Sequence, residues 1–236
     1  MLSGNQVKTA GKVLREVHDH QPDELRRALE TLETWRGVHA YPLNTAQIVL
    51  RARIATATGE KPEVAQRLKE LASIVAKLRR GAPRMQLTTM QDIAGCRGVV
   101  GSLDAVYKVV DTYRRSASRK STVVDVDDYI ASPAESGYRG VHVIAKTYDR
   151  PNDTMRFVEI QLRTRVQHDW AVGVEDLGKR YGYAFKQSEG PAEVLDYLRV
   201  ASQVFEAEEV NGSVRPSMID ALNRARDAAR EALERK

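Results

Sequence analysis

The chain has 236 residues, of which 42% are hydrophobic and 29% are charged, which is the composition of an ordinary folded protein. Its formal net charge of +5 favours phosphate-rich partners without distinguishing a nucleotide from a nucleic acid. A single cysteine, Cys96, excludes an internal disulfide and a cysteine-based zinc cluster. Because no signal peptide and no apolar run of membrane-spanning length is present, we expect a cytoplasmic protein with no membrane partner.

The first third of the chain has the apolar spacing of helices. Arg51 and Arg53, within this part, are candidates to line a ligand groove, although solvated basic residues are the more common interpretation. A proline suits the first turn of a helix, so the second helix is expected to begin at Pro22. The predicted helices cover residues 6–17, 22–32, 45–57 and 62–80, the last with an apolar stripe of Val64, Leu68, Leu71, Val75 and Leu78.

Beyond Gly81 the pattern changes to short strands alternating with helices. We expect strands at 93–100, 122–126, 141–148 and 157–163, with helices at 103–115, 165–183, 192–210 and 216–234. A turn at 151–153 indicates a hairpin, and hence antiparallel strands, on either side of it. The last helix could pack on the domain or protrude toward a partner. This order predicts an α/β (α+β) fold, with a mixed, largely antiparallel sheet of about five strands and flanking helices on one face.

The stretch from 156 to 170, RFVEIQLRTRVQHDW, carries the clearest functional pattern. Its apolar residues alternate with Glu159, Gln161 and Arg163, so these three polar side chains would share the outer face of a strand. Thr164 can cap the next helix, which places His168 in its first turn. An acid, an amide and a cation on one face suit a binding site, but an edge strand with solvated charges has the same pattern.

The loop SGYRGVH, residues 136–142, places an exposed-looking tyrosine and arginine between two glycines. Glycines free the backbone, the ring of Tyr138 offers a stacking face, and Arg139 and His142 can hold phosphate or hydroxyl oxygens. A tyrosine in a turn more often serves packing, so this loop alone is a weak signal.

Together with DIAGCR (92–97), DYIASP (128–133), VEIQLRT (158–164) and RLKELASIVAKL (67–78), this loop resembles the synthetase domain of the RelA/SpoT alarmone synthetase family. The resemblance covers roughly residues 45–182. It implies a nucleotidyltransferase-like synthetase core, which we place at 45–183, with helical extensions at 1–44 and 184–236. It also implies transfer of the β,γ-pyrophosphate of ATP to a ribose 3′-hydroxyl.

The resemblance assigns a role to each site residue. Asp92 and Glu159 would be catalytic and hold Mg²⁺, with Glu159 also a candidate acceptor for the hydroxyl proton. Cations would neutralise the triphosphate, and Tyr138 would stack on the acceptor base. The implied ATP-binding residues are Arg67, Lys69, Ser73, Lys77 and Arg97. The implied acceptor-binding residues are Tyr138, Arg139, His142, Gln161, Arg163 and His168.

Two departures from the family pattern bear on the acceptor. A lysine that is common before the Gly-Tyr is absent, and the stretch reads Pro133-Ala134-Glu135; Gly140 replaces a common serine. No His-Asp hydrolase region is recognisable, so we expect synthesis only. The motifs look most like the toxic branch of the family, which implies an antitoxin partner and, as first preference, the tRNA 3′ end as acceptor. GDP, GTP or an adenosine nucleotide is the alternative, an inactive RNA-binding module is the second, and a homo-oligomer is left open.

Overall fold

The computed structural model describes residues 2–16, 21–81, 84–116 and 120–235. Contacts divide the chain into two units, each assembled from several segments. The first comprises 1–98, 108–126 and 143–161, and the second comprises 99–107, 127–142 and 162–236. Each unit has an apolar core of its own. The domain limits expected from the sequence stay a prediction, although one helix, α3 (Ala40–Thr58), runs across the limit at 44/45.

Helices at the N-terminus form one core of the first unit. They are α1 (Gly4–Arg15), α2 (Pro22–Gly37) and, after α3, α4 (Leu71–Arg80). Helix α2 begins at Pro22 as predicted, and α1 packs against both α2 and α4. Leu14, Leu32, Ile74 and Leu78 are almost fully buried in this core. The predicted end of the first helix at Val17 lies outside the described residues.

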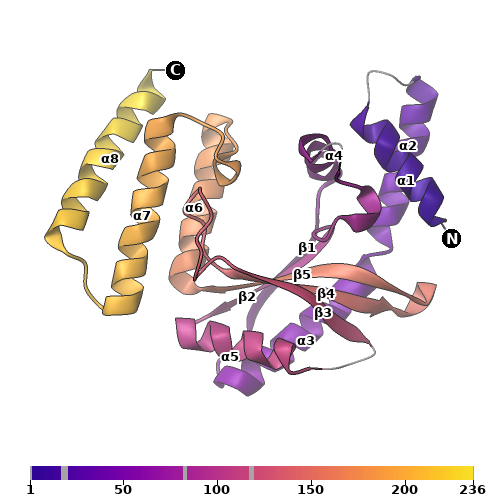
Figure 1. The fold of residues 1–236 in the computed structure, drawn as a ribbon, viewed down its shortest axis with the longest axis horizontal. Helices are drawn as coiled ribbons and strands as arrows, with labels where there is room; N and C mark the ends of the chain where they lie inside the picture. The colour runs from indigo at the N-terminus through magenta and orange to yellow at the C-terminus, as the bar shows by residue number, and fades with distance from the viewer. Residues whose placement is uncertain (1, 17–20, 82–83, 117–119, 236) are drawn as a thin grey trace. The chain divides into compact units, whose positions relative to one another are not determined.

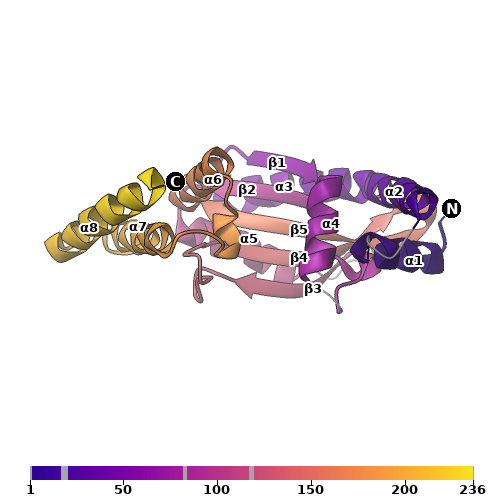
Figure 2. The ribbon, with the colours of Figure 1, turned by 90° about the horizontal axis from the view of Figure 1, so that it is seen from above.

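In the described part of the chain, five strands form a single sheet in the order β1-β2-β5-β4-β3, which confirms the predicted mixed sheet (Figure 2). The 3-10 turn η3 (Arg150–Asn152) joins β4 to β5 where a hairpin was expected. Another such turn, η2 (Leu87–Thr89), precedes β2, and helix α5 comes after β2. The bounds are β1 (Glu63–Leu68), β2 (Ala94–Val100), α5 (Leu103–Arg114), β3 (Ser121–Asp128), β4 (Val141–Asp149) and β5 (Thr154–Thr164).

The prediction of one helix over 62–80 was wrong. Residues Glu63–Leu68 form β1, and only Leu71–Arg80 form a helix. Val64 and Leu68 are four residues apart, a spacing that places side chains on one side of a helix and equally on one face of a strand. Pairing of β1 with β2 decides between the two, because it satisfies backbone groups of 63–68 in a ladder.

Helices cover both faces of the sheet in the first unit, whereas the sequence predicted one face. Figures 1 and 2 agree that α3 and α4 lie on opposite sides of the strands. The reason is visible in β4, where the neighbouring residues Val143 and Ile144 are 0% and 2% exposed. Successive strand residues point to opposite faces, so both faces must be covered.

The second unit is largely helical and contains α6 (Arg165–Tyr181), the 3-10 turn η4 (Phe185–Gln187), α7 (Ala192–Asn211) and α8 (Pro216–Glu234). Trp170 and Val174 of α6 enter its core. Helix α8 packs along α7 and buries Ala225 and Ala229, so the last helix packs on the domain (Figure 1). Among the described residues, none of the helices has the length and apolar character needed to cross a membrane.

Candidate active site

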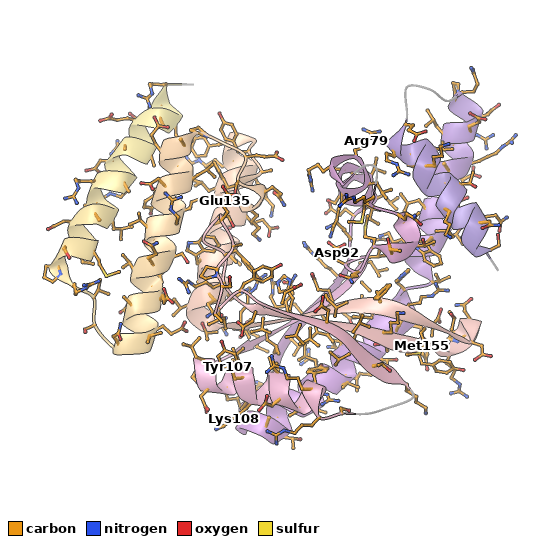
Figure 3. The ribbon with its side chains drawn as sticks, in the orientation of Figure 1. Arg79, Asp92, Tyr107, Lys108, Glu135 and Met155 are labelled. Carbon is orange, nitrogen blue, oxygen red and sulfur yellow. The ribbon has the colours of Figure 1, made fainter. Side chains whose placement is uncertain are left out.

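Two lysines converge on Asp92 in the first unit. Lys77 Nζ lies 2.7 Å and Lys69 Nζ 3.1 Å from the same carboxylate oxygen, Oδ2, and the Asp92 side chain is only 16% exposed. Burial by itself would raise the pKa of Asp92. The charges and hydrogen bonds of Lys77 and Lys69 outweigh it, and the pKa lies below its usual value. In Figure 3, Asp92 lies between α4 and the strands.

Local structure explains why these three residues meet. The Lys69 amide donates to the Ile93 carbonyl at 2.8 Å, which brings the residue after β1 beside the residue before β2. Arg36 holds the same turn by donating from Nε to the Lys69 carbonyl at 2.7 Å. Lys77 reaches Asp92 from α4, whose position is set by burial of Ile74 on the core side. The cluster is therefore built from a strand end, a strand start and a helix.

Glu159 lies on β5, the strand next to β2. A side chain placed at Gly95 would come within 3.8 Å of the Glu159 carbonyl, so these two residues are neighbours across the strands. Gln161 Nε2 donates to Glu159 Oε2 at 2.6 Å. The apolar residues of β5 are buried, as the alternation predicted: Val158, Ile160 and Leu162.

Cys96, which precedes Arg97 on β2, is buried and unreactive. Burial and, secondarily, the negative charge of Glu159 raise the pKa of its thiol to about 12. A thiol with that pKa is protonated at neutral pH, so Cys96 serves as a small apolar residue of the core.

The carboxylate of Asp92 fits a magnesium ligand by its chemistry. Oδ1 of Asp92 is buried and accepts no hydrogen bond from the described residues, while both lysines bind Oδ2. An acceptor oxygen buried without a partner is costly, so its place suits a bound cation. Mg²⁺ is usually held by one or two carboxylates together with water and substrate phosphates. The described residues contain no group of three or more acidic, histidine or cysteine side chains for a metal.

Aromatic and basic side chains gather around Tyr138 in the second unit. The Tyr138 hydroxyl lies 2.6 Å from His142 Nε2 and accepts a hydrogen bond from Arg163 Nε at 3.0 Å. The Arg163 guanidinium stands 4.8 Å from the centre of the ring. Tyr129 makes edge-on contacts with both Tyr138 and His142. Tyr138 is 9% exposed, so the expectation from the sequence that it is exposed was wrong.

Arg139 is also buried, contrary to the expectation from its loop. Its two terminal nitrogens bind the two carboxylate oxygens of Glu206 on α7, and one of them also donates to the Ile130 carbonyl at 3.3 Å. Sequence reasoning missed Glu206, because the pair is 67 residues apart and nothing in α7 distinguishes this glutamate from its acidic neighbours.

The start of α6 agrees with its prediction. Thr164 caps the helix by accepting from the Gln167 amide at 3.3 Å, and the Gln167 side chain accepts from the Thr164 amide in return. His168 is half-buried one turn into the helix. This reciprocal cap fixes where α6 begins directly after the strand that carries Arg163.

The family model that matches this chain is described as "Region found in RelA / SpoT proteins", and it covers residues 66–183. That span is half of the chain and includes Asp92, Glu159 and Tyr138. The protein belongs to the RelA/SpoT family. The helical extension from α7 onward lies beyond the matched residues.

Two relatives from Bacillus subtilis carry functional names. The chain is 37% identical to GTP pyrophosphokinase YjbM over 123 residues, which is 50% of this chain and 56% of that protein. It is 29% identical to GTP pyrophosphokinase YwaC over 144 residues, 58% of this chain and 65% of that protein. Each match thus spans less than two thirds of the relative. The structure of small alarmone synthetase 1 from B. subtilis, bound to its product pppGpp, is similar with a TM-score of 0.62 and 29% identity, over 76% of this chain and 95% of that one.

The other expected ATP-binding residues of this RelA/SpoT domain also lie in the first unit. Arg67 is exposed on β1, while Ser73 on α4 and Arg97 on β2 are half-buried. Arg97 alternates with Cys96 and so shares the face of Gly95, the neighbour of Glu159. The roles of these residues stay predictions.

Arg51 and Arg53 bind parts of the protein itself. Arg51 donates to the backbone carbonyls of Pro62 and Val64 at 3.3 and 3.0 Å, which anchors the start of β1. Arg53 donates to the Thr112 carbonyl and lies over the ring of Tyr113. Both guanidinium groups stabilise the fold, and a role in lining a ligand groove stays a prediction.

Proposed function

We propose that this protein is an ATP-dependent pyrophosphokinase that transfers the β,γ-pyrophosphate of ATP to the ribose 3′-hydroxyl of a guanosine nucleotide. The observation that carries the proposal is the cluster of Lys69, Lys77 and Asp92, within the matched RelA/SpoT segment and next to the strand that bears Glu159. Positive charge gathered around a buried carboxylate is what a Mg²⁺–triphosphate complex needs.

The donor residues act by charge and position. Lys69 and Lys77, with Arg67 and Arg97 from the adjoining strands, would neutralise the phosphates, and Ser73 would donate to a phosphate oxygen. Magnesium, held through Asp92 and Glu159, would supply further neutralisation of charge on the phosphates. Because phosphoryl transfer needs little covalent chemistry from the protein, such electrostatic stabilisation accounts for most of the catalysis.

In the transfer, the acceptor 3′-oxygen bonds to the β-phosphorus of ATP. The bond from that phosphorus to the oxygen bridging it to the α-phosphate breaks, and AMP leaves. The hydroxyl proton passes to the carboxylate of Glu159, whose Oε2 is already oriented by Gln161. Gln161 therefore holds the proposed base in place through its amide.

The acceptor base would bind at the cluster of Tyr138, His142 and Arg163. A base stacks favourably on an aromatic ring, and because Tyr138 is almost buried, part of the cluster would have to move aside to uncover it, while the bonds to its hydroxyl set the orientation of the ring. His168, half-buried early in α6, would contribute a further polar group to the acceptor. Guanosine nucleotides are preferred as acceptors because two relatives are named GTP pyrophosphokinases and the similar structure of a small alarmone synthetase is bound to its product pppGpp.

These relatives reverse the order of acceptors that the sequence motifs favoured. The tRNA 3′ end, a toxic role and an antitoxin partner now rest on motif resemblance and on the net charge of +5. Two basic residues that could follow a tRNA backbone, Arg51 and Arg53, donate to backbone carbonyls of the protein itself. The tRNA acceptor therefore ranks second.

Radiolabel transfer tests the proposal and its alternative together. The protein is incubated with γ-³²P-ATP, Mg²⁺ and, in separate reactions, GDP, GTP, ADP or deacylated tRNA. We expect label in GDP and GTP and loss of this transfer in Asp92→Asn. Label that enters tRNA alone would establish the second acceptor, and label in none of the four would refute pyrophosphokinase activity.

A further inference from the structure

Helix α7, which lies outside the matched family segment, contacts the loop that carries Tyr138. The two α7 residues involved are Ser202 and Glu206, four positions apart and therefore on the same side of the helix. Ser202 binds the residues on either side of Tyr138, Gly137 and Arg139, and Glu206 binds Arg139. The contacts all lie within the second unit.

Arg139 is held by several of these contacts. Its Nη1 and Nη2 donate to Glu206 Oε1 and Oε2 at 2.7 and 2.5 Å, and its Nε donates to Ser202 Oγ at 3.3 Å. The same guanidinium reaches the Ile130 carbonyl, and its side chain is only 10% exposed. A planar fork bound on two edges fixes the orientation of the arginine and of the backbone that bears it.

Gly137 is held just as closely on the other side of Tyr138. Ser202 Oγ donates to the Gly137 carbonyl at 2.5 Å. A side chain at Gly137 would come within 3.1 Å of the Arg199 Cα and of the Ser202 Cβ, and the φ of Gly137 is +86°. Only glycine allows both this conformation and this approach of the helix backbone.

From this we infer that Ser202 and Glu206 are positioning residues for the acceptor site, which hold the 137–139 segment and thereby set the ring of Tyr138. The inference rests on the proposed function, since it gives that ring the acceptor base. It also gives Arg139 an indirect role, through the loop rather than through a bond to the acceptor. Glu206 is 41% exposed, and without it Arg139 keeps its bonds to Ser202 and to the Ile130 carbonyl. Its loss should therefore disturb the loop more than the fold.

Glu206→Ala tests the inference, with Glu208→Ala as the matched control. Glu208 lies on the same helix and is exposed. In Glu206→Ala we expect the KM for GDP to rise about tenfold, because a charge-assisted bond is lost near the base site. Affinity for a non-hydrolysable ATP analogue, measured by calorimetry, should stay at the wild-type value. Glu206→Gln retains part of the hydrogen bonding, so its KM for GDP should lie between those of the wild type and Glu206→Ala.

A merely structural role would change other quantities. It would lower the thermal midpoint and weaken the binding of ATP and of GDP together. Either that pattern or a KM for GDP equal to that of the wild type would overturn the inference. If Glu206→Ala does not fold, the same measurements are made on Glu206→Gln. An unchanged KM for GDP in that variant would again contradict the inference.

Hydrogen exchange separates this inference from the proposed function. Amide exchange in the 136–141 peptide should accelerate in Glu206→Ala and stay unchanged in Glu208→Ala, whatever the acceptor proves to be. If the wild type modifies no guanosine nucleotide, the proposed function fails while faster exchange still supports the hold of α7 on the loop. Unchanged exchange would overturn the inference even in an active enzyme.

Discussion

The ammonium group of Lys77 on α4 lies 2.7 Å from the carboxylate of Asp92, which stands two residues before β2. The Asp92 carboxylate is thereby kept charged in a largely buried place. Lys69 binds the same oxygen, so neither lysine alone carries the contact. This arrangement leads to the first two predictions.

Lys77→Gln should weaken ATP binding while the fold is retained. Loss of one of two cations removes attraction for the triphosphate, and the KM for ATP should rise at least about tenfold by the usual strength of charge-assisted bonds. Arg80→Gln, at an exposed position of the same helix, is the control. Steady-state kinetics with ATP varied gives the answer, and equal behaviour of the two variants would remove Lys77 from the donor site.

The contribution of Asp92 to stability should depend on pH. Its pKa is lower in the folded protein than in the unfolded chain, so its stabilisation is full above the ordinary carboxyl pKa of about 4 and is lost as pH falls through the folded value. The difference in unfolding free energy between wild type and Asp92→Asn should be constant from pH 7 to 5 and shrink at lower pH. Urea unfolding at several pH values measures it, and a difference that grows on acidification would be inconsistent with the ion pairs.

Glu159→Gln should strongly slow transfer and leave the fold intact. The side chain is half-buried on the face opposite the apolar residues of β5, so the amide replaces the carboxylate at equal volume. Loss of a general base typically costs about 10²–10⁴ in rate. Turnover at saturating Mg²⁺ is the measurement, with Glu63→Gln at an exposed position of β1 as control. Near-normal turnover would show that Glu159 is neither base nor metal ligand.

Tyr138→Phe and Tyr138→Ala should separate the hydroxyl from the ring. Phenylalanine keeps the stacking surface but loses the bonds to His142 and Arg163, so acceptor KM should rise modestly. Alanine also loses stacking, worth about 1–3 kcal/mol per base. ATP affinity should be the same in both. If ATP binding falls in step with acceptor use, the ring belongs to the donor site.

Glu135→Lys should improve the use of GDP and GTP. Glu135 is exposed in the loop between β3 and β4, at the stretch where the family commonly has a lysine (Figure 3). Replacing an acid by a base there removes repulsion of the acceptor 5′-phosphates, and KM for GTP should fall about threefold to tenfold, with a weaker effect at high salt. Glu208→Lys makes the same charge change elsewhere on the surface. If both variants lower the KM for GTP equally, the improvement comes from net charge and not from the position of residue 135.

The sequence predicted the sheet well where alternation was long. In β5, three buried apolar residues alternate with polar ones, a pattern that only a strand with one face on a core satisfies. In β1, by contrast, Val64 and Leu68 fit either period, and the spacing from Leu68 to Leu71 continued the apparent helix across the turn at Lys69. Pairing with β2, which lies farther along the chain, makes this segment a strand.

The site residues were named by motif, but their environments were not predictable. Tyr138 and Arg139 were expected to be exposed because glycines flank them. In the structure both are buried, Tyr138 beside Arg163 and Arg139 against α7. Glu206 has no local signal, since its role depends on a helix folding back onto a loop more than sixty positions earlier. Long-range contacts of this kind carry no periodicity in the sequence.

The most direct test of the central claim compares GTP with 3′-deoxy-GTP as acceptor. The two nucleotides share base and 5′-phosphates and differ only in the hydroxyl that is proposed to react. With GTP and ATP, mass spectrometry should find a guanosine nucleotide carrying an added 3′-pyrophosphate and one AMP for each product molecule. With 3′-deoxy-GTP, neither the product nor stoichiometric AMP should form. A pyrophosphorylated product from 3′-deoxy-GTP, or no product from GTP alongside modification of deacylated tRNA, would contradict the account.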